Sequence, residues 1–391
     1  MTLAAAERLD DAALLETADP SSMLRQVASS AAQVREAARS AAEASLDELL
    51  AGGRPRAIVV TGMGGSGIAG EVLAAVAGPG CPVQVTTVHD YRLPGWVGAA
   101  DLVIAVSCSG ATEETLSAAE EAVRRGCRLL AVGSEGSALA ALAEQARAGF
   151  ICVKPSGMPR SMLWGLSVPL VVAAARLGVL DMPEQAYESA AVELERVAHL
   201  CRPDSDAFVN PAKSLALELS GTLPMIWGTS PLTWVAAARF ACQLHENGKY
   251  PAIAGVLPEA NHNQVVVFDG PFAPGPDPAG LASADLASAD LAAAGPAAPE
   301  PGQAPPVPLR LIMLRDTHEH PQVSRRREES ARIAADRGIE VTELAAAGDQ
   351  PLERLASLVQ LIDYASVYLA IANGIDPAPI AAIQELKARI A

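Results

Sequence analysis

The amino-acid sequence predicts an α/β fold of two tandem domains, each a parallel sheet flanked by helices. Short apolar runs alternate with helical stretches along most of the chain, which is the pattern of βαβ units. The length of 391 residues suits about two to three domains. Half of the residues are hydrophobic but only 4% are aromatic, so we expect an aliphatic core in which helices are layered on strands.

The first domain is expected at residues 1–183. It opens with an Ala-rich helix over 24–50, which Gly52 and Pro55 end. Five apolar runs of strand length follow, separated by helical stretches. The expected strands are 56–61, 83–88, 102–107, 129–133 and 150–153, and the helices between them are 67–77, 113–126 and 138–147.

The second domain is expected at residues 184–391, after a helical bridge over 184–200. Its architecture is inferred from element order, because no close internal repeat is visible. Its strands are expected at 223–227, 252–254, 264–268, 309–314 and 341–344, and its helices at 212–220, 233–247, 325–337, 351–371 and 379–390. Pro, Ala and Gly dominate residues 271–308, where Leu-Ala-Ser-Ala-Asp occurs twice in tandem, so a flexible insert is expected there.

Charge and cysteine usage limit the classes of partner. The net charge of −16 disfavours an extended nucleic-acid surface or an anionic membrane. The six cysteines never form C-x-x-C, which gives no sign of a zinc ribbon or a redox pair. The N-terminus lacks the features of a signal peptide, and the apolar stretch 162–180 is expected as a buried helix. A soluble cytoplasmic protein is the resulting expectation.

A glycine-rich segment lies between the first strand and the following helix. It reads Gly-Met-Gly-Gly-Ser-Gly from residue 62 to residue 67, where backbone N–H groups and a helix N-terminus converge on an anion. Gly62, Gly64 and Gly67 also satisfy G-x-G-x-x-G, with Asp90 after the next strand, so a dinucleotide site is an alternative. A tight turn with no ligand is a second alternative.

The end of the third strand favours phosphate. Ser107, Ser109 and Thr112 run into a helix N-terminus, and their hydroxyls can donate hydrogen bonds to phosphate oxygens. A nicotinamide-binding half does not need such a cluster. Because parallel α/β sheets bind ligands at the carboxyl ends of neighbouring strands, we expect these side chains to form a pocket for one phosphate with Gly65 and Ser66.

The pairing of G-M-G-G-S-G with S-x-S-G-x-T resembles the sugar isomerase (SIS) domain. Two such domains in tandem resemble the bifunctional phosphoglucose/phosphomannose isomerases. The likeness extends to Gly133-Ser134, Pro159-Arg160-Ser161, Gly228-Thr229-Ser230 and residues 239–263. It implies two doubly wound αβα SIS domains and an aldose–ketose isomerase that interconverts fructose 6-phosphate with glucose 6-phosphate, mannose 6-phosphate or both through a cis-enediol.

The resemblance also implies roles for four residues. Glu246 corresponds to the base that moves a proton between C1 and C2 of the sugar phosphate. His262 corresponds to the acid/base that opens the sugar ring, and in the family it acts in the neighbouring subunit, which implies a homodimer with shared active sites. Arg160 would stabilise the enediolate, and Lys387 would assist ring opening or bind substrate hydroxyls.

Three positions depart from the family pattern. His245 stands where Asn is frequent, Cys108 where Tyr is common and Ala378 where Thr is frequent, which could alter turnover or substrate choice. A catalytically silent sugar-phosphate-binding protein with a regulatory role is the alternative function. No cofactor is expected, and no metal is expected because no His/Asp/Glu cluster has ligand spacing.

Overall fold

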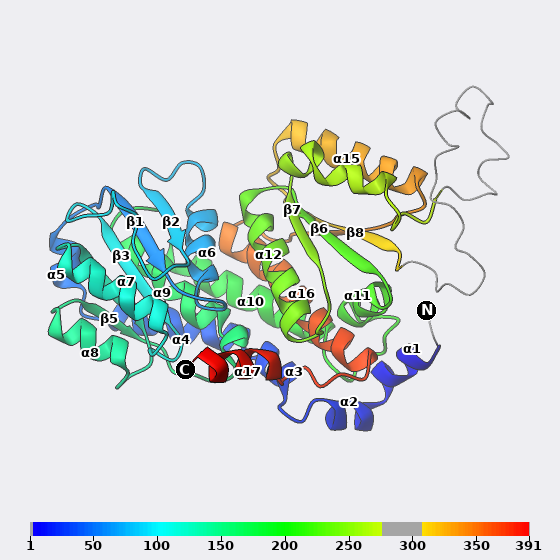
Figure 1. The fold of residues 1–391 in the computed structure, drawn as a ribbon, viewed down its shortest axis with the longest axis horizontal. Helices are drawn as coiled ribbons and strands as arrows, with labels where there is room; N and C mark the ends of the chain where they lie inside the picture. The colour runs from blue at the N-terminus through cyan, green and yellow to red at the C-terminus, as the bar shows by residue number, and fades with distance from the viewer. Residues whose placement is uncertain (1–2, 276–306, 391) are drawn as a thin grey trace. The chain divides into compact units, whose positions relative to one another are not determined.

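The computed structural model describes residues 3–275 and 307–390. The chain forms two compact units, each built around one parallel sheet (Figure 1). The first-sheet unit comprises Ser22–His199 and Gly348–Gln360. The second-sheet unit comprises Met1–Ser21, Leu200–Ala347 and Leu361–Ala391. The predicted α/β class is confirmed in both.

The first sheet has five parallel strands in the order β2-β1-β3-β4-β5. The strands are β1 (Ala57–Thr61), β2 (Gln84–Val88), β3 (Leu102–Ser107), β4 (Arg128–Gly133) and β5 (Gly149–Cys152). All five predicted strands are confirmed to within a residue or two at their ends. The three central strands are buried almost throughout, as parallel strands covered on both faces must be.

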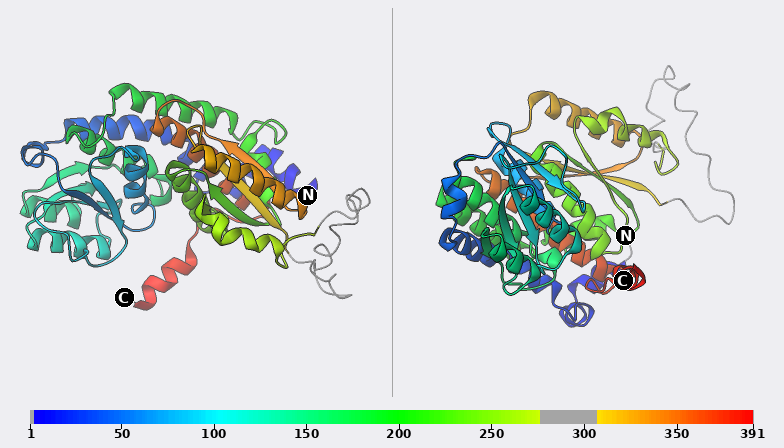
Figure 2. Two further views of the ribbon diagram at one scale, coloured as in Figure 1. Left: turned by 90° about the horizontal axis from the view of Figure 1, so that it is seen from above. Right: turned by 60° about the vertical axis from the view of Figure 1, so that its left-hand side comes forward.

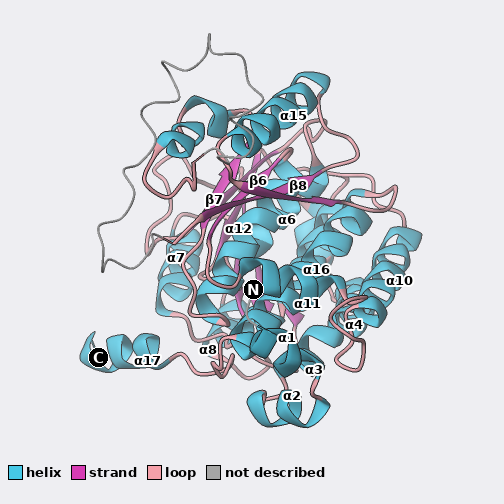
Figure 3. Cartoon of the chain, turned by 90° about the vertical axis from the view of Figure 1, so that its right-hand side faces the viewer, coloured by secondary structure: helices cyan, strands magenta, loops and turns pink. Residues whose placement is uncertain are grey.

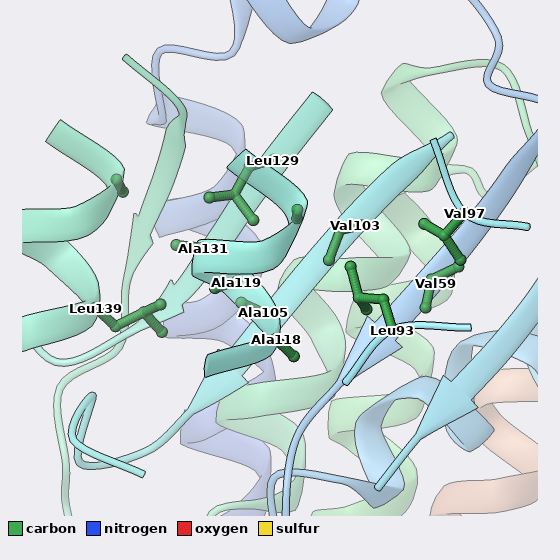
Figure 4. Close-up of a cluster of buried hydrophobic side chains, with 12 residues drawn as sticks. Val59, Leu93, Val97, Val103, Ala105, Ala118, Ala119, Leu129, Ala131 and Leu139 are labelled. Atoms are coloured by element: carbon green, nitrogen blue, oxygen red, sulfur yellow. The ribbon is translucent and has the colours of Figure 1, made fainter. Parts of the chain in front are cut away.

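Helices cover both faces of this sheet. They are α3 (Met23–Ala28), α4 (Ser30–Glu43), α5 (Asp47–Ala51), α6 (Ile68–Ala77), α7 (Glu113–Arg124), α8 (Ala138–Gln145), η1 (Pro159–Ser161), α9 (Leu163–Arg176) and α10 (Glu184–Leu200). Helices α7 and α8 pack on one face, while α4, α6 and α9 pack together on the other (Figure 1). Where α7 packs on the sheet, the core includes the small side chains of Ala118 and Ala119 on the helix and of Ala105 and Ala131 on the strands, beside larger aliphatic side chains (Figure 4). These alanines let α7 approach the strands closely.

The single leading helix expected over 24–50 is wrong, because the segment forms α3, α4 and α5. At the first break the Ser29 hydroxyl donates to Gln26 O at 2.7 Å and the Ser30 hydroxyl to Val27 O at 2.8 Å. Serine hydroxyls that bind nearby carbonyls compete with helical hydrogen bonds. The apolar stretch 162–180 forms α9, whose residues from Leu163 to Ala174 are all buried, as expected.

The second sheet has four parallel strands in the order β7-β6-β8-β9. They are β6 (Leu223–Gly228), β7 (Ile253–Val256), β8 (Leu309–Arg315) and β9 (Glu340–Ala345). Counted from its own first strand, this order repeats β2-β1-β3-β4 of the first sheet. The topology therefore supports the duplication that element order alone predicted.

The helices of the second-sheet unit are α1 (Leu3–Asp10), α2 (Ala12–Ala18), α11 (Pro211–Leu219), α12 (Pro231–Glu246), η2 (Glu259–His262), η3 (Gln264–Asp269), α15 (Pro321–Asp336), α16 (Pro351–Ala372) and α17 (Ala381–Ile390). Helix α12 packs on β6, β7 and β8 (Figure 3). Helix α15 packs against β9 and η3. Of α16, the part from Leu361 onward belongs to this unit.

The strand expected over 264–268 is wrong, because this valine-rich run forms the 3-10 helix η3. The Gln264 side chain accepts a hydrogen bond from Trp227 Nε1 at 2.6 Å and donates to Ala254 O at 3.1 Å. Phe268 stacks on Trp227 with ring centroids 5.5 Å apart. The segment thus packs over one face of the sheet instead of extending it.

The two compact units divide the chain between His199 and Leu200, whereas the expected domain boundary is at residue 183. Helix α10 is tied to α4 within the first-sheet unit, where Arg35 bonds to Glu188 at 2.7 Å and to Glu195 at 3.1 Å. The N-terminal residues are tied to the second-sheet unit instead. There Asp10 Oδ1 accepts hydrogen bonds from Ala207 N at 2.7 Å and from Lys213 Nζ at 3.4 Å.

Most of the insert expected at 271–308 lies outside the described residues, which stop at 275 and resume at 307. The described ends belong to the packed unit. Ala273 is 4% exposed in the core beneath α15, and Leu309 N donates to Phe272 O at 2.8 Å.

One helix in the described part of the chain is long and apolar enough to cross a membrane. It is α16, and 94% of its most apolar window is buried inside the structure. Such burial is what the core helix of a globular domain shows.

Candidate functional site

The glycine-rich segment of residues 62–67, here called the glycine loop, joins β1 to α6 in the first-sheet unit. Gly64 has φ of +52°, a conformation that favours glycine. A Cβ on Gly65 would lie 2.9 Å from Pro159 O, so the loop backbone is pressed against the turn that carries Arg160. The absence of side chains at these positions lets the loop N–H groups approach a ligand closely.

Ser66 and the end of β3 are joined directly. Cys108 N donates to Ser66 Oγ at 3.1 Å. Ser107 Oγ lies 2.9 Å from Thr112 Oγ1 and 3.5 Å from Ser109 Oγ. Thr112 is the N-cap of α7, and its side chain makes no capping bond. The structure therefore brings the predicted hydroxyl groups together at the N-terminal ends of α6 and α7.

Arg160 lies in the 3-10 turn η1 and is 4% exposed. Two glutamines from the N-terminal helices hold this turn. Gln26 Oε1 accepts hydrogen bonds from Met158 N at 2.7 Å and from Ser161 Oγ at 3.1 Å, and Gln33 Nε2 donates to Ser161 O at 2.8 Å. Arg160 is thus a buried cation whose backbone packs against the glycine loop.

His89 contacts the glycine loop and was not predicted from the sequence. It follows β2, and its Nδ1 donates to Gly62 O at 2.9 Å, while its Nε2 lies 3.7 Å from Glu71 Oε1 on α6. The Glu71 carboxylate raises the pKa of His89 above its ordinary value. A Cβ on Gly67 would lie 2.6 Å from the His89 ring. The only signal in the sequence was a histidine at the carboxyl end of a strand neighbouring β1.

The corresponding place in the second sheet carries different chemistry. After β6, Ser230 caps α12, and its hydroxyl donates to Asp316 Oδ2 at 2.7 Å. Asp316 directly follows β8, the counterpart of β3, and is buried. A carboxylate therefore stands where the first sheet has its hydroxyl cluster, and it repels an anion. Of the two sheets, the first has the strand ends suited to phosphate.

Glu246 is the last residue of α12 and is partly exposed. A buried ion pair and two buried side-chain hydrogen bonds hold this helix against α16. Arg239 binds Asp363 through Nε at 2.8 Å and Nη2 at 2.5 Å, and Gln243 Nε2 donates to Asp363 Oδ1 at 3.1 Å. Asn247 Nδ2 donates to Ser366 Oγ at 2.9 Å. The spacing of four residues puts all three polar groups on one helix face, which sets the axial position of Glu246.

His262 and Lys387 lie in other parts of the second-sheet unit. His262 is exposed at the end of η2, which its flanking asparagines anchor: Asn261 Nδ2 donates to Ser330 Oγ at 2.7 Å, and Asn263 Nδ2 to Glu259 Oε1 at 2.9 Å. Lys387 lies on α17, all ten residues of which are exposed. This helix projects from its own sheet (Figure 2, left).

The chain is similar to known proteins in both sequence and fold. The family model for the bacterial phospho-glucose isomerase C-terminal SIS domain matches residues 208–390. A bifunctional phosphoglucose/phosphomannose isomerase from Caldicellulosiruptor bescii is 32% identical over 335 residues, covering 85% of this chain and 89% of that relative. The chain belongs to this family. The Aquifex aeolicus member is 28% identical over 337 residues, with the same two coverages.

Fold comparison agrees with the SIS assignment. A Clostridium difficile structure described as a candidate phosphosugar isomerase superposes with a TM-score of 0.67 at 14% identity, covering 94% of this chain and 97% of the other. At that identity the match shows the fold alone.

The three positions that we expect to depart from the family pattern, Cys108, Ala378 and His245, have identifiable surroundings. Cys108 contributes its backbone, since its N–H binds Ser66 and its carbonyl accepts from Ser134 Oγ at 2.5 Å, and burial raises the pKa of its thiol. Ala378 is 3% exposed, and its N–H donates to Asp376 Oδ1 at 2.9 Å. His245 is exposed beside Glu246. At Cys108 and Ala378, the local backbone is hydrogen-bonded.

Within residues 3–275 and 307–390, no group of three or more His, Cys, Asp or Glu side chains is arranged to hold a metal ion. The chemistry that the described groups of this family member offer is that of hydroxyl, amide, guanidinium, imidazole, ammonium and carboxylate groups. Such groups can bind a phosphate and move protons.

Proposed function

We propose that this chain isomerises fructose 6-phosphate to glucose 6-phosphate, mannose 6-phosphate or both. The proposal rests on one observation at the carboxyl ends of β1 and β3. There Ser66, Ser107 and Thr112 gather at the N-termini of α6 and α7. This neutral set of donors suits a phosphate dianion. Membership of the isomerase family supplies the reaction class.

The phosphate of the substrate binds the loop N–H groups around Gly65 and the hydroxyls of Ser66, Ser107, Ser109 and Thr112. Binding energy from this non-reacting end of the substrate positions the sugar carbons. Arg160, buried beside the loop, supplies a fixed positive charge for the enediolate oxygen.

Glu246 is assigned as the base. In the aldose-to-ketose direction its carboxylate takes the proton from C2, the C2–H electron pair forms the C1–C2 double bond of the cis-enediol, and the C1=O π pair moves to O1, which is protonated. The O2–H proton then leaves, C2=O forms, and the electrons of the C1–C2 double bond take the proton back from the same carboxyl at C1. His262 is assigned to ring opening by moving the O5 and O1 protons, for which imidazole has a suitable ordinary pKa. Lys387 assists ring opening or binds substrate hydroxyls.

The proposal includes a homodimer in which His262 serves the site of the neighbouring subunit. The exposure of His262 in the single chain is compatible with that role. Mixing Glu246→Gln chains with His262→Ala chains then restores about a quarter of wild-type activity, because half of the dimers are mixed and each has one intact site. No recovery after verified subunit exchange would contradict the shared site. The six free cysteines suit the reducing cytoplasm, where we place the protein.

The direct test supplies fructose 6-phosphate and measures glucose 6-phosphate and mannose 6-phosphate separately with coupled dehydrogenases. We expect sustained conversion to at least one aldose. Binding of fructose 6-phosphate by calorimetry without any conversion over hours would contradict the isomerase proposal and favour the regulatory alternative.

A further inference from the structure

Lys249 makes an unusual set of contacts just after α12. Its ammonium donates to four backbone carbonyl oxygens: Glu246 O at 3.0 Å, Asn247 O at 3.3 Å, Asp376 O at 3.1 Å and Pro377 O at 2.9 Å. Glu246 is the last residue of α12 and Asn247 is its C-cap, while Asp376 and Pro377 lie in the segment between α16 and α17. One side chain therefore joins two parts of the second-sheet unit that are more than 120 residues apart in the sequence.

The first two contacts complete the end of α12. The last carbonyls of a helix lack partners within the helix, and a lysine ammonium near the C-terminus both binds them and interacts favourably with the helix dipole. Here the capped carbonyl belongs to Glu246 itself. The contact therefore acts on the backbone from which the proposed base projects.

The other two contacts hold the segment that leads into α17. Asp376 Oδ1 accepts from Ala378 N at 2.9 Å, and Pro377 and Ala378 are buried, so the segment is ordered where Lys249 binds it. Beyond it, every residue of α17 is exposed. A hollow of about 340 Å³ lies between the end of α12 and the start of α17. It is lined by His245, Glu246, Lys249 and residues 379–383. Glu246 and the first turn of α17 thus line one hollow, and Lys249 lies in its wall.

The backbone of Lys249 indicates that the arrangement is constrained. Its φ is +50°, a left-handed conformation that costs a non-glycine residue free energy. Glycine adopts this conformation readily, yet it cannot supply an ammonium. The position therefore combines a glycine-like backbone with a long cationic side chain.

We propose that Lys249 is a positioning residue that holds Glu246 and the segment carrying Lys387 in register, through the four carbonyl groups that its ammonium binds. The inference rests on the proposed function, because Glu246 and Lys387 take their roles from it. In this proposal Lys249 acts through the carbonyl groups that it binds and not on the substrate. Its effect on the reaction is to fix where the proton-transfer carboxylate and the C-terminal lysine stand.

Three substitutions at Lys249 distinguish the effect of its ammonium group from the effect of its left-handed backbone. Lys249→Met keeps the apolar stem and removes the donors, Lys249→Arg keeps a cation with several N–H groups, and Lys249→Gly relieves the left-handed strain while removing the side chain. We expect Lys249→Met and Lys249→Gly to lower kcat by roughly 10- to 100-fold with little change in KM, because displacement of reacting groups by about 1 Å has effects of that size. Lys249→Arg should retain more activity than Lys249→Met. A merely structural role would instead make Lys249→Gly the best tolerated of the three.

Hydrogen exchange supplies a readout that is independent of activity. In Lys249→Met, amides of residues 376–390 should exchange faster than in the wild type, while those of β6 and β8 keep their protection. Lys154→Met, on an exposed lysine of the first-sheet unit, is the matched control and should change neither kcat nor exchange.

Unchanged kcat in Lys249→Met, or a fall in kcat without faster exchange at 376–390, would overturn the inference. If the wild type does not isomerise fructose 6-phosphate, the proposed function fails. Faster exchange in Lys249→Met would still support the coupling of the two segments in that case. The two failures are therefore distinguishable.

Discussion

The backbone N–H of Cys108 donates a hydrogen bond to the hydroxyl of Ser66 at 3.1 Å, and this bond joins the glycine loop to the end of β3. Because the Ser66 oxygen serves as the acceptor, its own O–H is left to donate to a ligand. In the proposed function, that O–H donates to the phosphate of the substrate.

Ser66→Ala should therefore weaken binding of the sugar phosphate. A hydrogen bond to a charged group contributes about 1.5–3 kcal/mol, so the Kd for fructose 6-phosphate, measured by calorimetry, should rise by roughly 10- to 100-fold. Ser220→Ala is the control, since that hydroxyl binds Asn373 in the second-sheet unit. Equal Kd values for Ser66→Ala and the wild type would exclude Ser66 from the phosphate site.

His89 makes the stability of the glycine loop depend on pH. Glu71 raises the pKa of His89, so the charged pair contributes stability that is fully present below the unfolded pKa of about 6.5 and is lost as pH rises through the higher folded value. His89→Gln should thus reduce the free energy of unfolding more at about pH 5.5 than at about pH 9, by less than about 1 kcal/mol because the pair is partly exposed.

The measurement is urea unfolding of the wild type and His89→Gln at both pH values. Glu71→Gln provides the control, because in that background the pH dependence of the His89 effect should disappear. The same destabilisation at both pH values would mean that the charge on His89 does not act on the loop.

The ion pair between Arg239 and Asp363 should be costly to break from one side. Both side chains are 4% exposed, and removing one partner of a buried pair typically costs about 3–5 kcal/mol because the other charge is left uncompensated. Asp363→Ala should lower the free energy of unfolding by this amount in urea titrations. The exposed pair of Arg39 and Glu36 is the control, where Glu36→Ala should leave the free energy of unfolding nearly unchanged. A loss below about 1 kcal/mol for Asp363→Ala would contradict a charged buried pair.

Most of the fold could be predicted from the local pattern of apolar residues in the sequence. The aliphatic runs of β1, β3 and β4 are buried on both faces, so their composition alone marked them as strands. Residues 264–268 have the same valine-rich composition but form η3, because Phe268 and Gln264 find partners on Trp227 over the sheet face. Such tertiary contacts leave no local trace in the sequence.

The contact between the glycine loop and the end of β3 was predictable for a related reason. Strand ends in a parallel sheet meet at one edge, so Ser66 and Ser107 could be paired from their positions alone. The groups that hold the end of α12, and with it Glu246, could not be predicted in this way. Asp363 and Ser366 lie on a helix more than 100 residues from α12, and the four acceptors of Lys249 are backbone carbonyls, which no residue type reveals.

The central claim is that Glu246 moves the proton in an aldose–ketose isomerisation. The most direct measurement is NMR of the product formed from fructose 6-phosphate in deuterated water. We expect the wild type to give an aldose 6-phosphate with deuterium at C2, because a proton held on the carboxylate can exchange with solvent. Glu246→Gln should slow conversion by about 10²–10⁴-fold with little change in the Kd for fructose 6-phosphate, since it keeps the shape of the side chain but accepts no proton. Conversion and deuterium incorporation at wild-type rates in Glu246→Gln would contradict the claim.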